Sequence, residues 1–154
     1  MTLVKKNELI LLVEDNNEDF ELTKRALRKA GLHNNLLRFE DGDEALDYLH
    51  RNGKYADPQT SPRPGIILLD LNLPGTDGRE VLREIKTDER LRTIPVIVLT
   101  TSEDERDIQY CYNSGANSYL HKQVDPTGFY TVIQRLKDYW FEIVILPKEE
   151  KWTP

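Results

Sequence analysis

Short apolar runs recur along the chain and are separated by longer segments of mixed polarity. They are three to five residues long, which suits β-strands. The runs are "LILLV" at 9–13, "NLLRF" at 35–39, "IILL" at 66–69, "VIVL" at 96–99 and "SYL" at 118–120. Four of them are nearly continuous in apolar character, as strands buried on both faces of a parallel sheet require. The pattern therefore predicts five strands.

The segments between these runs carry apolar residues at helical spacing. In the first segment Phe20, Thr23, Leu27 and Ala30 share one helical face, and Gly31 stands where a C-terminal cap belongs. Helices are predicted at residues 18–31, 43–53, 77–88, 104–116 and from Pro126 to about Leu146. Strand and helix alternate five times, which indicates a doubly wound α/β fold with helices on both faces of a parallel sheet.

Charge and composition exclude several classes of function. The net charge of −6 and the pI of about 5.1 argue against a surface that neutralises phosphates, so no nucleic-acid partner is expected. The single cysteine, Cys111, excludes an internal disulfide framework and a cysteine-based zinc site. Leu9–Val13 is too short for a signal-peptide core, and no run is long enough to span a membrane. We therefore expect a cytoplasmic protein without a membrane partner.

Polar side chains follow four of the predicted strands. In an open parallel sheet the ligand site lies beyond the carboxyl ends of the strands. The residues at these ends are Glu14 and Asp15, then Asp70, then Thr100 and Thr101, and finally His121 and Lys122. Asp and Thr at such positions are often only helix caps or turn formers. Three carboxylates on one edge would, however, repel one another unless a cation joined them, and oxygen ligands suit a hard ion such as Mg²⁺.

The motifs that contain these residues resemble those of the receiver domains of two-component response regulators. The resemblance covers about residues 7–140 and rests on "LLVEDN", "LLDLNLPGTDG", "VIVLTTS" and "SYLHK". It implies a flavodoxin-like sheet with strand order 2-1-3-4-5 and five helices. The roles that it implies are Asp70 as phosphoacceptor, Glu14, Asp15, Asp70 and the backbone carbonyl of Asn72 as metal ligands, Thr100 and Tyr119 as switch residues, and Lys122 as the cation that binds the Asp70 carboxylate and its acyl phosphate.

The resemblance also implies a function. A receiver accepts a phosphoryl group from a sensor histidine kinase in a reaction that depends on Mg²⁺, and it catalyses only its own phosphorylation and dephosphorylation. Thr100 would then bond the new phosphate, and Tyr119 would turn toward the space that Thr100 leaves. The altered surface would signal, or relay phosphate, to a downstream protein.

Two positions depart from the common receiver pattern. Gln123 stands where most receivers have a proline, so the Lys122–Gln123 peptide bond should be trans. Glu14 replaces the commoner aspartate. Together with the long loop at 52–65 and the "DYW…LP" ending, these features resemble the single-domain regulators that partner bacterial phytochrome kinases. We therefore expect one stand-alone receiver domain over residues 1–154 and a phytochrome-type kinase as partner.

The end of the chain is more apolar than an exposed terminus needs to be. Residues 141–154 are expected to form a C-terminal extension after the last helix. The apolar side chains of this region are Tyr139, Trp140, Phe141, Ile143, Val144, Ile145 and Leu146. They either cover the monomer's own sheet or form a homodimer contact, and alternate faces of one helix could do both. A homodimer through the last helix and the tail is expected.

Two other classes of function fit part of the pattern. A phosphatase of the haloacid-dehalogenase type also uses an aspartate nucleophile and Mg²⁺, but it has a second aspartate two residues on, where this chain has Asn72. An adaptor that had abandoned phosphorylation would not need the acids or Lys122. His33, His50 and His121 are not at metal-ligand spacing, so surface or loop positions are expected for them.

Overall fold

The computed structural model describes residues 8–123, 125–143, 145 and 147. Five parallel strands form one sheet in the order β2-β1-β3-β4-β5, so the predicted fold class and strand order are confirmed. The elements are β1 (Ile10–Val13), α1 (Asn17–Lys29), β2 (Leu36–Phe39), α2 (Gly42–His50), the 3-10 helix η1 (Gly53–Tyr55), β3 (Ile66–Leu69), α3 (Gly78–Thr87), β4 (Val96–Thr100), α4 (Glu105–Asn113), β5 (Ser118–His121) and α5 (Pro126–Trp140). No helix in the described part of the chain is both long and apolar enough to cross a membrane.

The central strands β1 and β3 position the end of the sheet where the acids lie. Every side chain of β1 and β3 is buried, as their continuous apolar sequences predict. Val13 of β1 pairs with Leu69 of β3, and the N–H of Asp70 donates to the carbonyl of Val13 at 3.1 Å. The two strands therefore end level with each other, and Glu14 and Asp70 follow on neighbouring strands.

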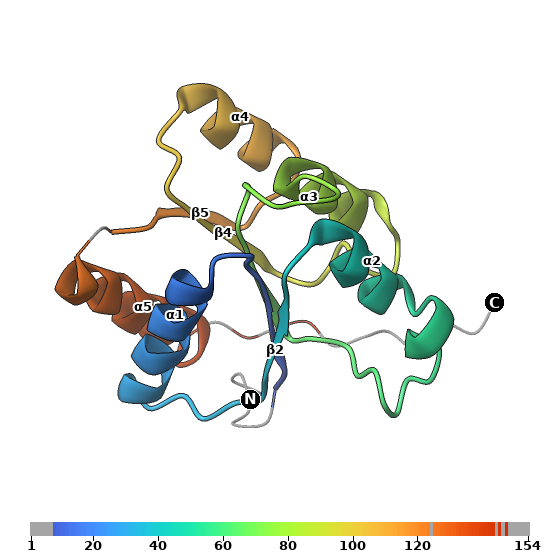
Figure 1. The fold of residues 1–154 in the computed structure, drawn as a ribbon, viewed down its shortest axis with the longest axis horizontal. Coiled ribbons are helices and arrows are strands. Elements are labelled where there is room, and N and C mark those ends of the chain that lie inside the picture. Colours follow the sequence, from blue (N-terminus) through green and yellow to red (C-terminus); the bar gives the residue numbers. More distant parts are fainter. Residues whose placement is uncertain (1–7, 124, 144, 146, 148–154) are drawn as a thin grey trace.

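Helices cover both faces of the sheet (Figure 1). α1 and α5 lie side by side on one face, where Leu27 and Ile133 pack in one apolar cluster with the strands. α2, α3 and α4 cover the other face, where Val81 and Cys111 pack in a second cluster. Burial raises the pKa of the Cys111 thiol to about 11. The single cysteine is thus a core residue.

Local signals account for both ends of α1. The side chain of Asn16 accepts a hydrogen bond from the N–H of Asp19 at 2.9 Å and caps the first turn. At the other end Gly31 has a φ of 92°, and its N–H donates to the carbonyl of Arg28 at 3.0 Å. The predicted glycine cap is therefore confirmed, because the left-handed conformation there is one that glycine adopts readily.

Two glycines allow the turn after β3 to lie close to neighbouring helices. A Cβ added to Gly78, the first residue of α3, would lie 2.2 Å from the carbonyl oxygen of Asp70. A Cβ added to Gly42, the first residue of α2, would lie 2.0 Å from the carbonyl oxygen of Thr76. The N–H of Gly78 also donates to the carbonyl of Leu71 at 2.9 Å. The backbone that carries Asp70 is therefore held closely by both helices.

The last helix is shorter than predicted. α5 ends at Trp140 rather than near Leu146, and the N–H of Phe141 donates to the carbonyl of Lys137 at 3.0 Å to close the final turn. Trp140 and Phe141 are both buried in the cluster beneath α1 and α5. Neighbouring residues point about 100° apart on a continuous helix. Leaving the helix at Phe141 lets both side chains reach the same core.

The apolar end of the chain is buried in part and exposed in part. Trp140 and Phe141 cover the monomer's own sheet, whereas Tyr139, Ile143 and Ile145 are 53%, 67% and 58% exposed. The remaining apolar residues of the predicted extension, Val144 and Leu146, lie outside the described residues. The homodimer contact expected of this region stays a prediction.

Candidate functional site

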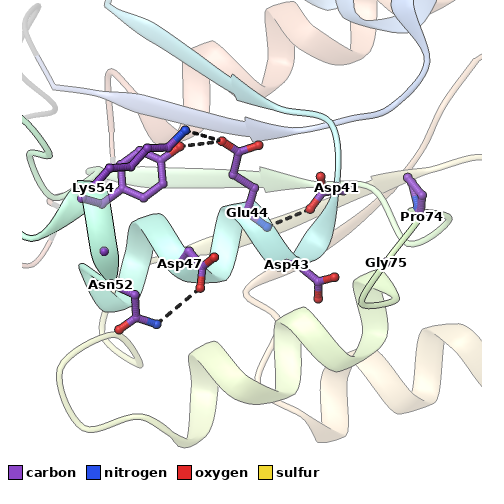
Figure 2. Close-up of a pocket in the computed structure, with 10 residues that line it drawn as sticks. Asp41, Asp43, Glu44, Asp47, Asn52, Lys54, Pro74 and Gly75 are labelled. Atoms are coloured by element: carbon purple, nitrogen blue, oxygen red, sulfur yellow. Dashed lines mark hydrogen bonds and ion pairs between the residues drawn. The ribbon is translucent and has the colours of Figure 1, made fainter.

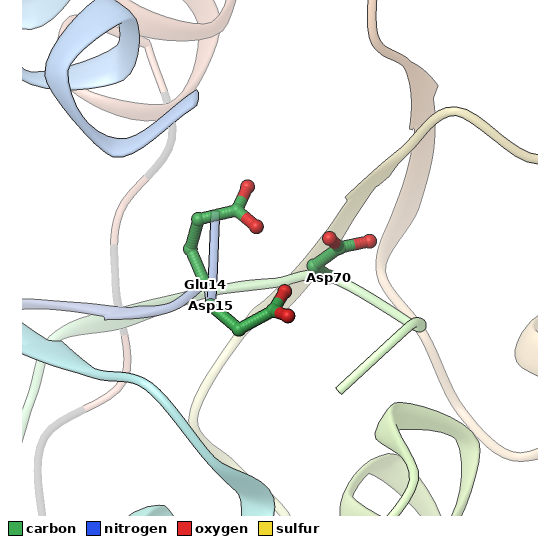
Figure 3. Close-up of side chains that lie close together, drawn as sticks. All are labelled: Glu14, Asp15 and Asp70. Atoms are coloured by element: carbon green, nitrogen blue, oxygen red, sulfur yellow. The ribbon is translucent and has the colours of Figure 1, made fainter. Parts of the chain in front are cut away.

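Three carboxylates meet at the carboxyl ends of β1 and β3 (Figure 3). One oxygen each of Glu14, Asp15 and Asp70 lies within 4.8 Å of the others. Among the described residues this is the one group of three or more His, Cys, Asp or Glu side chains spaced to hold a metal ion. Glu14 and Asp70 are buried and Asp15 is exposed, so the group is open to solvent on one side. A donor set made only of oxygens suits a hard divalent cation.

Lys122 extends from the end of β5 into the same group of acids. Its Nζ bonds the Glu14 carboxylate and lies 2.9 Å from Asp19 Oδ2 and 3.2 Å from Asp70 Oδ2. The side chain of Lys122 is only 4% exposed. No cis peptide bond occurs among the described residues, so the Lys122–Gln123 bond is trans, as predicted. The lysine reaches Asp70 with that geometry.

One ammonium group therefore faces three carboxylates, and this imbalance determines the charges of the site. Burial of Glu14, reinforced by the charge of Asp70 and opposed by Lys122, raises the pKa of the Glu14 carboxyl to about 7. Burial alone would lower the pKa of Lys122, but the charges of Asp70 and Glu14 and the hydrogen bond to Asp19 outweigh burial and raise that pKa above its usual value. Lys122 is thus a permanent cation, and the site still carries excess negative charge that a divalent cation would offset.

The two oxygens of Asp70 have different partners. Oδ1 accepts a hydrogen bond from the N–H of Leu71 at 2.7 Å, and the N–H of Asn72 lies 3.5 Å from the same oxygen. Oδ2 faces the Lys122 ammonium. Asn72 is exposed beside the acids, and the role expected for its backbone carbonyl stays a prediction.

The two expected switch residues lie on the neighbouring strands β4 and β5. Thr100 is fully buried, and its carbonyl accepts a hydrogen bond from the N–H of Lys122 at 2.7 Å. The Tyr119 hydroxyl donates to the carbonyl of Ser102 at 2.9 Å, so it is attached to the loop that follows Thr100. Partial burial raises the pKa of Tyr119, which remains a neutral donor. The Ser102 N–H lies 3.5 Å from Thr100 Oγ1, so the side chains of Thr100 and Tyr119 both contact the loop after β4.

Two other residues of the predicted edge do not join the acids. His121 Nε2 lies 3.1 Å from the carbonyl oxygen of Thr101, and His121 Nδ1 lies 3.6 Å from Glu103. Thr101 is exposed. Away from this edge, His50 Nδ1 lies 3.4 Å from Asp88 Oδ2. None of these side chains belongs to the candidate metal group in the described part of the chain.

The structure adds a polar network that the sequence pattern did not indicate. Arg79, at the start of α3, holds both oxygens of Asp107 in α4 at 2.6 and 2.8 Å. Ser102 Oγ also donates to Asp107, at 2.6 Å. The hydrogen bonds from Arg79 and from Ser102 lower the pKa of Asp107 to about 2. The loop after β4 is thereby joined to the helix that begins directly after the Asp70 turn.

Asp19 is a second residue that the sequence pattern did not indicate. It stands in the first turn of α1, where an acid is also favoured by the helix dipole. No local signal could have identified it, because acids are common in the first turn of a helix and Asp15, the neighbouring acid of the site, lies before α1 begins at Asn17. Only the tertiary structure brings it to Lys122, which lies 103 residues further along the chain.

A hollow of about 640 Å³ lies beside the N-terminus of α2 and contains further acids (Figure 2). Its acids already have local partners. The Asp41 side chain caps α2 by accepting from the N–H of Glu44, Asp43 accepts from the Thr76 hydroxyl, and Glu44 accepts from the Tyr55 hydroxyl at 2.6 Å. These contacts account for the acids as residues that cap the helix and hold the loops. The candidate metal site is therefore the group of acids at the strand ends.

Comparisons with known proteins agree with this geometry. A family model described as the response regulator receiver domain matches residues 10–134. Response regulator Rcp1 of Synechocystis sp. is 42% identical over 140 residues, which are 91% of this chain and 93% of that protein. The crystal structure of the phosphorylated cyanobacterial phytochrome response regulator RcpA has a TM-score of 0.87 at 40% identity, and it covers 92% of this chain and 99% of that chain.

A second solved structure bears on the group of acids. The Mn²⁺-bound form of response regulator Rcp1 has a TM-score of 0.85 at 42% identity, over 92% of this chain and 99% of that chain. Family, fold and arrangement of acids thus point to the same conclusion. This chain belongs to the receiver-domain response regulators of two-component signalling.

Proposed function

We propose that this response regulator accepts a phosphoryl group on Asp70 from a sensor histidine kinase, in a reaction that depends on Mg²⁺. The observation that carries the proposal is the position of Asp70. It ends a fully buried strand, one of its oxygens lies 3.2 Å from the Lys122 ammonium, and it shares a 4.8 Å group with two other acids. A carboxylate held in this way is a positioned nucleophile beside a cation, and phosphoryl transfer requires a positioned nucleophile and positive charge near the phosphoryl oxygens.

The two oxygens of Asp70 would divide the work of the transfer. Oδ1 is held by the N–H of Leu71, which leaves Oδ2 to attack the phosphorus atom. A new bond forms between Oδ2 and phosphorus. The bond from phosphorus to the kinase's phosphohistidine nitrogen breaks, and that nitrogen keeps the electron pair. As Oδ2 loses its charge, the nearby Lys122 ammonium passes its hydrogen bond to a phosphoryl oxygen.

Glu14, Asp15, Asp70 and the backbone carbonyl of Asn72 would hold the metal ion. A bound dication supplies positive charge to the phosphoryl oxygens and offsets the excess of acids. The oxygen-only donors support Mg²⁺, and the Mn²⁺-bound form of the similar Rcp1 supports a divalent ion in general. The buried Glu14 and Asp70 would hold the ion from the inside and the exposed Asp15 from the solvent side.

Phosphorylation would signal through the loop after β4. Thr100 would hydrogen-bond the phosphoryl group and draw this loop toward Asp70. Tyr119 is attached to the carbonyl of Ser102 in the same loop, so its position would change with the loop. The downstream protein would read this change or accept the phosphate. The protein would act on no other substrate and catalyse only the gain and loss of its own phosphate.

The names of the relatives support a kinase partner of the phytochrome type, because RcpA is described as a phytochrome response regulator. We further propose that residues 1–154 act as a single receiver domain in the cytoplasm. The exposed apolar side chains of Tyr139, Ile143 and Ile145 support a homodimer through the last helix and the tail. Light scattering across micromolar concentrations should detect the dimer, and a monomer throughout would refute it.

Substitution of Asp70 tests whether it is the phosphoacceptor. Wild-type protein incubated with Mg²⁺ and acetyl phosphate should gain one phosphoryl group by mass spectrometry, and chelation of the metal should prevent this. Asp70→Asn should gain none. Asp77→Asn is the matched control, because Asp77 lies in the same loop, is exposed, and can cap α3 equally well as asparagine.

Two results would contradict the proposal. Labelling of Asp70→Asn at the wild-type level would show that another residue is the acceptor. Sustained release of phosphate from an external phosphomonoester over many turnovers would instead favour a phosphatase.

A further inference from the structure

We propose that Asp19 is a positioning residue for phosphoryl transfer: with Glu14 it holds the Lys122 ammonium so that the third N–H faces Asp70 Oδ2. The inference rests on the proposed phosphorylation of Asp70. Asp19 lies in α1, outside the strand ends that supply the other acids. Its role would be to keep a cation in place, without touching the phosphoryl group.

The first support is the match between donors and acceptors. A lysine ammonium has three N–H donors and no acceptor. Three carboxylates surround Lys122 Nζ: Glu14, Asp19 Oδ2 at 2.9 Å and Asp70 Oδ2 at 3.2 Å. With one donor assigned to each acid, Glu14 and Asp19 determine where the remaining N–H points. Removing either would leave the ammonium able to turn away from Asp70.

The second support is that Asp19 is itself well fixed. Its N–H donates to the Asn16 side chain at 2.9 Å, and its carbonyl accepts from the Thr23 hydroxyl at 2.8 Å. Thr23 is buried, so this turn of α1 is anchored to the core. The Asp19 side chain is 30% exposed, yet its oxygen lies closer to Lys122 Nζ than the Asp70 oxygen does. A residue held in this way can serve as a reference point for a long, flexible lysine side chain.

The third support is a division of work among the acids. Glu14 and Asp70 both belong to the candidate metal group, whereas Asp19 does not. A dication in that group would compete with Lys122 for the oxygens of Glu14 and Asp70. Asp19 alone of the three acids would keep its full charge for the lysine. It would therefore matter most when the site is loaded and ready to react.

The consequence for the reaction is geometric. As the bond between Asp70 Oδ2 and phosphorus forms, the bond from phosphorus to the donor breaks and the donor keeps the electron pair. The N–H that faced Oδ2 then faces a phosphoryl oxygen, and only a small movement of the ammonium is needed. Misplacing a catalytic group by about 1 Å can cost up to about a hundredfold in rate. Loss of one of two anchors should cost less, so we expect about a tenfold effect.

Variants at Asp19 test this inference with acetyl phosphate at a fixed concentration. Phosphorylation is followed by mass spectrometry over a range of Mg²⁺, well below each variant's unfolding temperature. Asp19→Ala should lower the rate constant at saturating Mg²⁺ about tenfold, while half-saturation occurs at an unchanged Mg²⁺ concentration. Asp19→Asn keeps an oxygen that can accept the hydrogen bond from Lys122, so its rate constant should fall less than that of Asp19→Ala. Asp19→Glu should restore most of the rate, which a merely structural role would not predict.

Two further variants test whether the effect of Asp19→Ala comes from the lost contact with Lys122, from the lost negative charge or from a change in α1. Glu18→Gln removes one negative charge from the same turn at an exposed position. Thr23→Val removes the hydroxyl that bonds the Asp19 carbonyl, but it keeps the carboxylate. Glu18→Gln should phosphorylate at the wild-type rate. Thr23→Val loosens the turn that holds Asp19, so its rate should fall by less than that of Asp19→Ala. If Glu18→Gln matches Asp19→Ala, the effect is general electrostatics and the inference is wrong.

The remaining outcomes distinguish this inference from the proposed function. If Asp19→Ala is phosphorylated on Asp70 at the wild-type rate or faster, the positioning role is refuted, and Asp70 is still the acceptor. A variant altered only in its Mg²⁺ requirement also refutes it, because Asp19 would then act on the metal. Wild-type protein that is not phosphorylated, or is phosphorylated elsewhere, refutes the proposed function and the role of Asp19 with it.

Discussion

Gly78→Ala adds one methyl group at the start of α3, where the backbone leaves no room for it. The added Cβ would lie 2.2 Å from the carbonyl oxygen of Asp70 and 2.5 Å from Cα of Leu71. Comfortable contacts between such atoms are about 3.5 Å, so the two backbone segments must separate by about 1 Å. The obstacle is backbone on both sides, and no side chain can rotate away to relieve it.

The cost follows from three contributions. Strain from an added methyl group in a tightly packed place is about 1–3 kcal/mol. Separation also weakens the 2.9 Å hydrogen bond from the Gly78 N–H to the Leu71 carbonyl, which is worth about 1 kcal/mol. Alanine returns about 1 kcal/mol because it favours the helix more than glycine does. The net loss is about 2 kcal/mol, or about 4–8 °C in Tm for a chain of this length.

Urea unfolding followed by circular dichroism would measure this loss, with and without Mg²⁺. Gly128→Ala is the matched control, because the three atoms nearest to its added Cβ are side-chain atoms, Asp125 Oδ2 at 2.9 Å and Gln123 Cβ and Cγ at 3.1 and 3.3 Å. Side chains can adjust, so the control should change stability by less than about 0.5 kcal/mol. Gly78→Ala should also slow phosphorylation while still folded, since the displaced backbone carries Asp70. A variant as stable and as reactive as wild type would refute the reasoning.

Three further predictions concern charge and packing. Asp107 has a pKa of about 2, below its value in the unfolded chain, so its ion pair stabilises the fold above pH ~4 and is lost as pH falls through about 2. Asp107→Asn should therefore cost about 1–2 kcal/mol at pH 7 in urea unfolding, and the difference from wild type should disappear near pH 2. Lys122→Met leaves buried acids without their cation, so it should lower the free energy of unfolding by about 3–5 kcal/mol in the presence of a chelator. Mg²⁺ should restore part of this stability. Equal losses with and without Mg²⁺ would contradict the prediction. Trp140→Ala should cost about 3–5 kcal/mol in unfolding free energy. Tyr139→Ala should barely change stability, and it should weaken the proposed homodimer in light scattering.

The sheet was predictable because each strand is a short apolar run, too short for a buried helix, and helical patterns lie between the runs. The runs at 66–69 and 96–99 are buried along their full length, as their composition requires. The meeting of Glu14, Asp70 and Lys122 was predictable for a related reason, because parallel strands deliver the residues that follow them to one edge. These inferences need only the order of strands and helices.

The features that were missed depend on how helices pack. Asp19 meets Lys122 from 103 residues away in the sequence, and no local pattern encodes that contact. The ion pair between Arg79 of α3 and Asp107 of α4 likewise joins residues 28 positions apart in the sequence. The end of α5 was misjudged because the apolar run continues past Trp140, so the pattern gives no signal for where the helix stops.

The burial of Cys111 has a practical consequence. It is the chain's one cysteine, and with a pKa of about 11 its thiol is almost wholly protonated and inaccessible at neutral pH. The natural thiol can therefore stay in place when a second one is introduced for labelling. Arg106→Cys would put a reactive thiol on α4, where the native side chain is 91% exposed and lies outside the proposed dimer contact, and dyes attached there would report association between two copies by energy transfer. The native core thus already provides an almost unreactive background for fluorescence work.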